Sequence, residues 1–102
     1  MKSVAALREN LAKRDLLGLV EDLAKRHGAL VDEVLACNRE PRVCRARQAA
    51  WYALRHHGEV EWSYPAIGRL FDRDHTTVMA GVRAYERWLA TRRGDGDAVA
   101  AE

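Results

Sequence analysis

Long apolar runs, cysteine and proline are all scarce in this sequence of 102 residues. No stretch approaches the ~20 consecutive apolar residues that cross a bilayer, so we expect no membrane partner. The N-terminal segment does not resemble a secretion signal, because Arg8 and Glu9 interrupt its apolar residues. A chain of this length buries one modest core. These features predict a soluble, cytoplasmic protein.

The only two cysteines, Cys37 and Cys44, match no known metal or disulfide pattern. A reducing cytoplasm disfavours a structural disulfide between them. A zinc site would need two more ligands, and only His56 and His57 lie nearby in the sequence. Adjacent histidines on a helix point about 100° apart, so they rarely share a metal. We expect two free thiols, no metal and no cofactor.

Motifs for catalysis are also missing. No G-x-x-x-x-G-K-[ST] phosphate loop occurs, so we expect no bound nucleotide. His75 lies between Asp74 and Thr76, but neighbours in sequence do not face each other on a helix. The sequence therefore predicts that the protein is not an enzyme.

Lysine is absent from residues 36–93, where arginine is abundant. This segment contains eleven arginines and six acidic residues, a net charge of +5 in a chain whose total is +2. Residues 1–35 are balanced. Concentrated basic charge is typical of proteins with a phosphate-rich partner. A solvated arginine-rich surface is the alternative that composition leaves open.

Apolar residues recur with the helical period of 3.6 and no strand pattern occurs, so we expect an all-α fold. The first helical stretch begins after Ser3, ends at Gly28, and is bent or split at Gly18. Four more helices are expected: Leu30–Ala36, Val43–His57, Ser63–Phe71 and Asp74–Gly94. We interpret residues 58–62 as a connector and the acidic residues 94–102 as a disordered tail.

The last two expected helices are joined by only Asp72 and Arg73, which is typical of a helix-turn-helix. In that motif the second helix presents its first residues to the major groove. Here they are Asp74, His75, Thr76 and Thr77, whose side chains can bond to base edges or pack on a thymine methyl. A plain helix start, with Asp74 as its cap, is the simpler interpretation of the same string.

Three segments in this order decide between the two interpretations: ACNREPRVCRARQ, SYPAIGRLF and RDHTTVMAGVRAYERW. With them, residues 20–92 resemble the C-terminal DNA-binding domain (domain IV) of the bacterial replication initiator DnaA. The resemblance implies a compact, Trp-repressor-like helical domain, residues 20–93, that binds double-stranded DnaA boxes of the TTATCCACA type. It implies base contacts from Arg39, Asp74, His75, Thr76 and Thr77, with Arg39 in the minor groove. It implies phosphate contacts from Arg47, Gln48, Arg55, Tyr64, Pro65 and Arg73.

This sequence departs from the family pattern at the turn. The family usually has two residues between the phenylalanine and the Arg-Asp-His string, whereas here Asp72 stands alone. The shortening is expected to rotate or tighten the start of the recognition helix. We expect a stand-alone nucleoid-associated regulator of replication initiation or transcription. The alternatives are a protein-interaction adaptor with vestigial DNA binding and a fragment of a longer chain.

Residues 1–19 carry an apolar stripe of Val4, Leu7, Leu11 and Leu16. On a straight helix its first part lies about 13–24 Å before residue 20, beyond the edge of the domain. An exposed stripe predicts a weak homodimer or a protein partner that engages residues 3–17. The alternative is that the chain breaks at Gly18 and folds the first half back onto its own core.

Overall fold

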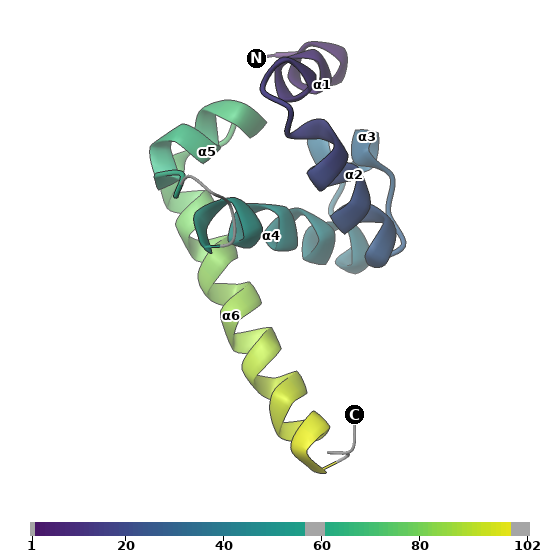
Figure 1. Ribbon diagram of the computed structural model, residues 1–102, viewed down its shortest axis with the longest axis vertical. Coiled ribbons are helices and arrows are strands. Elements are labelled where there is room, and N and C mark those ends of the chain that lie inside the picture. Colours follow the sequence, from purple (N-terminus) through teal and green to yellow (C-terminus); the bar gives the residue numbers. More distant parts are fainter. Residues whose placement is uncertain (1, 57–60, 99–102) are drawn as a thin grey trace.

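The computed structural model describes residues 2–56 and 61–98, with the backbone alone in residues 93–98. Within this part of the chain every regular element is an α-helix, which confirms the expected all-α fold (Figure 1). The helices are α1 (Val4–Lys13), α2 (Leu17–Arg26), α3 (Val31–Leu35), α4 (Pro41–His56), α5 (Tyr64–Phe71) and α6 (His75–Ala98). Helix α4 runs through the middle of the body, and the long α6 crosses it and extends beyond it.

Serine side chains start two of the helices, as the sequence predicts. The Ser3 hydroxyl accepts a hydrogen bond from the amide of Ala6 at 3.1 Å, and the Ser63 hydroxyl accepts one from Ala66 at 3.2 Å. Each satisfies an amide that has no partner inside its helix. Gly28, at φ +73°, follows the end of α2 in the left-handed conformation that favours glycine. These local signals fix the ends of the helices independently of the core.

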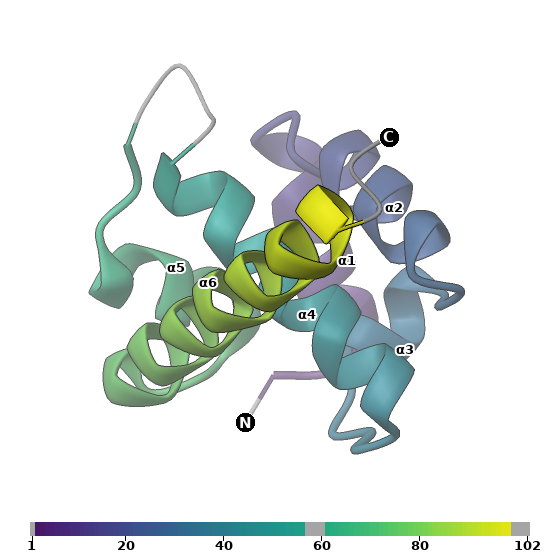
Figure 2. The same ribbon diagram turned by 90° about the horizontal axis from the view of Figure 1, so that it is seen from below.

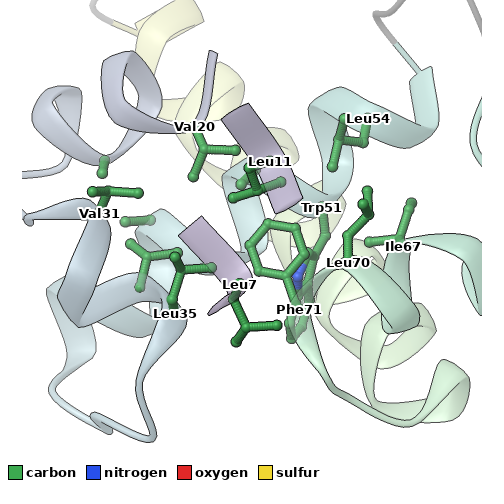
Figure 3. Close-up of a cluster of buried hydrophobic side chains, with 14 of the residues drawn as sticks. Leu7, Leu11, Val20, Val31, Leu35, Trp51, Leu54, Ile67, Leu70 and Phe71 are labelled. Atoms are coloured by element: carbon green, nitrogen blue, oxygen red, sulfur yellow. The ribbon is translucent and has the colours of Figure 1, made fainter. Parts of the chain in front are cut away.

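The core is built from buried side chains of all six helices, and Figure 3 shows those of α1 to α5 converging on one cluster. Leu7 and Leu11 of α1 are 2% and 0% exposed, and they lie among side chains of the other helices. Trp51 of α4 packs its ring edge against Phe71 of α5, with ring centroids 6.0 Å apart. Val78 of α6 is also fully buried. Burial of these apolar side chains is the main force that holds the helices together.

The expected exposure of the N-terminal stripe was wrong. The chain turns back between α1 and α2 at Asp15, whose φ of 60° ends the first helix. Leu7 and Leu11 therefore enter the core instead of extending past it. The break lies before Gly18, which is inside α2. With Leu7 and Leu11 buried and Val4 and Leu16 half-buried against the core, α1 no longer supports the homodimer or partner expected at residues 3–17.

Other helix ends differ from expectation by a few residues. Helix α4 begins at Pro41, two residues early, because proline suits the first turn of a helix. Helix α6 continues through residues 94–98, which the composition assigns to the disordered tail, so Gly94 does not end it. Residues 99–102 of that tail and 57–60 of the expected connector lie outside the described residues.

Candidate nucleic-acid interface

Helices α5 and α6 form the helix-turn-helix, and Asp72 makes its sharp turn. Asp72 adopts the left-handed conformation at φ 55° and ψ 51°, which ends α5 after Phe71. The amide of Arg73 then donates to the carbonyl of Gly68 at 2.8 Å. The backbone of Lys2 also reaches this turn, because its amide donates to the Asp72 carboxylate at 2.9 Å. One residue after the phenylalanine is therefore enough to reverse the chain.

The first turn of α6 presents four exposed polar side chains, Asp74, His75, Thr76 and Thr77. Asp74 caps the helix: its Oδ2 accepts from the amide of Thr76 at 3.1 Å and from the Thr76 hydroxyl. Hydrogen bonds from that hydroxyl and then from the amide lower the pKa of the Asp74 carboxyl. Its Oδ1 lies 3.9 Å from Nδ1 of His75 and accepts no hydrogen bond within the described residues.

A second exposed element is the loop at residues 36–40 between α3 and α4. The side-chain oxygen of Asn38 accepts from the amide of Glu40 at 2.9 Å, which fixes the loop backbone on both sides of Arg39. The Arg39 side chain is exposed and makes no hydrogen bond or ion pair within the described residues. An arginine held this way can reach a narrow, electronegative minor groove.

Arg47 points into the protein and is only 8% exposed. Its Nε donates to the carbonyl of Val34 at 2.8 Å, and its Nη2 donates to those of Ala36 and Asn38 at 2.8 and 2.9 Å. These carbonyls end α3 and begin the loop, where helical partners are missing. Burial, and then the charge of Arg73, lower the pKa of Arg47. This placement differs from the surface phosphate contact that the resemblance implied.

A groove of about 410 Å³ runs between α4 and α6. Gln48 lines it from α4, and Thr77 lines it from the first turn of α6. Gln48 accepts from Arg45 at 3.0 Å through its side-chain oxygen, which leaves the amide N–H groups pointing away from that bond. The structure thus brings Gln48 and Thr77, which are far apart in sequence, to one edge of the recognition helix.

The comparisons with known proteins agree with this geometry. The model of the family described as the bacterial dnaA protein helix-turn-helix matches residues 19–84. The chain belongs to this DnaA helix-turn-helix family. The matched residues contain most of α2, all of α3, α4 and α5, and the first ten residues of α6, and therefore the helix-turn-helix and the loop that carries Arg39.

Curated relatives carry the same family name. The chromosomal replication initiator protein DnaA of Mycoplasma pneumoniae is 35% identical over 71 residues, which are 70% of this chain and 16% of that protein. The DnaA of Cereibacter sphaeroides (strain ATCC 17029 / ATH 2.4.9) is 33% identical over 86 residues, 83% of this chain and 18% of that protein. This chain thus spans less than a fifth of the length of either relative. No solved structure matches it.

Three more residues to which the DnaA resemblance assigned phosphate contacts gather at the start of α5. The guanidinium of Arg55 lies 4.7 Å from the ring centre of Tyr64. Its Nη1 donates to Glu61 at 3.2 Å and to the carbonyl of Trp62 at 3.3 Å, whereas its buried Nε has no hydrogen-bond partner among the described residues. Pro65 is exposed beside Tyr64. Figure 2, which views the molecule from below, shows α5 beside the first turns of the recognition helix.

Sequence reasoning missed Arg87 as a residue of this surface. It is exposed, lines the same groove as Gln48 and Thr77, and has no ion pair within the described residues. Thr77, Ala80, Ala84 and Arg87 follow one another at the spacing of a single helix face. This spacing is the signal in the sequence that could have identified Arg87. Arg87 adds positive charge to the edge of the recognition helix.

The described residues hold no group of three His, Cys, Asp or Glu side chains arranged for a metal ion. Cys37 and Cys44 are both free thiols. Among the described residues, none of the helices combines the length and the apolar character needed to cross a membrane.

Proposed function

We propose that this chain binds double-stranded DNA in a sequence-specific manner, at sites like the DnaA box. The observation that carries the proposal is the presence of two exposed polar elements, the start of α6 and the Arg39 loop, on one helical domain. Base contacts fix sequence, and phosphate contacts fix position. The protein is a non-catalytic, nucleoid-associated binder that controls replication initiation or transcription by occupying its sites.

Each reading residue has a role that its chemistry supports. The free Asp74 Oδ1 accepts from a cytosine amino group, and His75 and Thr76 contact base edges. Thr77 contacts a thymine methyl or a phosphate. Arg39 enters an A/T-rich minor groove, where the negative potential is strongest.

The phosphate contacts flank these reading residues. Gln48 holds a phosphate on the α4 side, and Arg55, Tyr64 and Pro65 hold the backbone on the α5 side. Arg73 is set apart from these contacts, because its guanidinium already donates to the backbone carbonyls of Ala36, Phe71 and Asp72. Partly exposed guanidinium, amide and phenol groups all suit phosphate oxygens.

Selection of bound sequences from a pool of random duplex DNA tests this function. We expect a short motif to be enriched. His75→Ala and Thr76→Ala should each then reduce discrimination between the best site and single-base variants by about 1–3 kcal/mol. Thr91→Ala is the matched control, since Thr91 is an exposed threonine on the same helix whose hydroxyl donates to the carbonyl of Arg87 at 3.0 Å. Enrichment of no motif, with capture of a protein partner instead, would favour the adaptor function.

A further inference from the structure

Two guanidinium groups from different elements converge on one carbonyl oxygen. The oxygen of Ala36 accepts from Nη2 of Arg47 at 2.8 Å and from Nη2 of Arg73 at 2.9 Å. Arg47 belongs to α4, whereas Arg73 immediately precedes the recognition helix. Ala36 is 37 residues before Arg73 in the sequence. The Ala36 carbonyl therefore links two parts of the chain that no local turn connects. We call this carbonyl and its two guanidinium donors, Arg47 and Arg73, the joint.

On one side of the joint lies the loop that carries Arg39. Ala36 caps the end of α3, and its carbonyl opens the loop. Arg47 also holds the carbonyl of Asn38 at 2.9 Å, and the Asn38 side chain holds the amide of Glu40 at 2.9 Å. The backbone before and after Arg39 is thus fixed by bonds that lead back to the same guanidinium.

On the other side lies the start of the recognition helix. The Nη1 of Arg73 donates to the carbonyls of Phe71 and Asp72 at 3.1 and 3.3 Å, and its amide is held by Gly68. Asp74, the helix cap, is the next residue. The planar guanidinium of Arg73 has five N–H donors and can therefore bond to the carbonyls of Ala36, Phe71 and Asp72 at once. A lysine ammonium lacks that fixed geometry.

We infer that Arg73, together with Arg47, acts as a positioning residue that sets the distance between Arg39 and the first turn of α6. This inference rests on the proposed function, because that distance matters only if both elements read one DNA site. The joint then fixes how many base pairs separate the minor-groove contact from the major-groove contacts. Arg73 contributes to specificity through the loop and not through a base.

A double-mutant cycle tests the inference on two duplexes. One duplex is the best selected site, and the other has its A/T segment under Arg39 replaced by G/C. Arg39→Ala should lower the A/T preference of the protein by about tenfold or more. Arg73→Gln should lower that preference to a similar degree, and in the Arg39→Ala background it should lower it no further. Arg73→Lys, which keeps the charge, should behave like Arg73→Gln.

The family-implied role of Arg73 as a phosphate contact gives the opposite pattern. In that case Arg73→Gln weakens binding to both duplexes equally, and its effect on affinity multiplies with that of Arg39→Ala. The slope of log affinity against log salt also becomes less steep by about one unit. That result would overturn the inference and leave the proposed function intact. If Arg39→Ala alone leaves the A/T preference unchanged, the proposed role of the loop fails first. Should Arg73→Gln not fold, Arg73→Lys carries the same comparison.

Discussion

A β-carbon added to Gly68 would lie 2.4 Å from the carbonyl oxygen of Arg73 and 3.6 Å from the amide of His75. The first distance is far below van der Waals contact, and the neighbour is backbone that cannot rotate away. Only glycine lets α5 approach the start of the recognition helix this closely. The glycine of the SYPAIGRLF segment is therefore required by the turn that holds the residues proposed to contact bases.

Gly68→Ala should consequently displace the start of α6. We expect a loss of about 1–3 kcal/mol in the free energy of unfolding, typical of overpacking, and weaker binding to the selected duplex. Chemical denaturation and anisotropy titration measure the two effects. Gly18→Ala is the matched control: nothing lies within 4 Å of a β-carbon added at this position of α2, so it should raise stability by about 0.5–1 kcal/mol. Equal behaviour of the two variants would contradict this account of the turn.

The sequence was sufficient to predict the helix-turn-helix because its signals are local. Ser63 and Asp74 cap their helices through residues two or three positions away, and Asp72 turns the chain alone. The destination of Arg47 could not be predicted this way. It depends on unpaired carbonyls at the end of α3, which a pattern of charges along α4 does not reveal. The joint at Ala36 was hidden for the same reason.

The periodicity of apolar residues likewise could not predict that α1 folds back onto the core. A straight helix and a broken one show the same apolar spacing, and the break at Asp15 is one residue in the left-handed conformation. Packing then decides, because Leu11 is fully buried once the chain turns back.

Leu11→Ala should therefore cost about 2–5 kcal/mol of stability, as large-to-small changes in a core do. Leu19→Ala is the control, since Leu19 on α2 is 38% exposed and its loss should be well below that range. Denaturant unfolding gives both values. Sedimentation of the wild-type chain should show a single protomer. If the wild-type chain were a dimer that dissociated on Leu11→Ala with no change in stability, Leu11 would lie in an exposed stripe and not in the core.

The histidine at the end of α2 should make stability depend on pH. His27 lies against Tyr85 and Trp88, with its Nε2 3.3 Å from the tyrosine hydroxyl. Burial, followed by the charge of Arg45, lowers the pKa of His27 below 6.5. As the pH falls below about 6.5, the unfolded chain gains a proton that the folded chain resists. Stability should fall across that window until the pH passes the folded pKa.

An NMR titration of the His27 ring checks the direction of its pKa, and denaturation at several pH values checks the linkage. His27→Gln should flatten the pH dependence below 6.5. Tyr85→Phe is the informative control: it removes the hydroxyl but keeps the burial and the charge of Arg45, so the dependence should persist. A His27 midpoint above 6.5 would refute the assignment of burial as the leading cause.

The net charge of +5 in residues 36–93 predicts that DNA binding weakens steeply with salt. With about six phosphate contacts, log affinity against log salt should have a slope near −5. Arg87 lines the groove beside Thr77, so Arg87→Gln should make the slope less steep by about one unit. Arg92→Gln is the control on the same helix. Its guanidinium stacks on Trp88 at 4.9 Å instead of lining the groove, and residue 92 lies about 25 Å along α6 from His75. Equal slopes for wild type and Arg87→Gln would show that Arg87 does not contact DNA. A slope near zero in the wild type would contradict all of the proposed phosphate contacts.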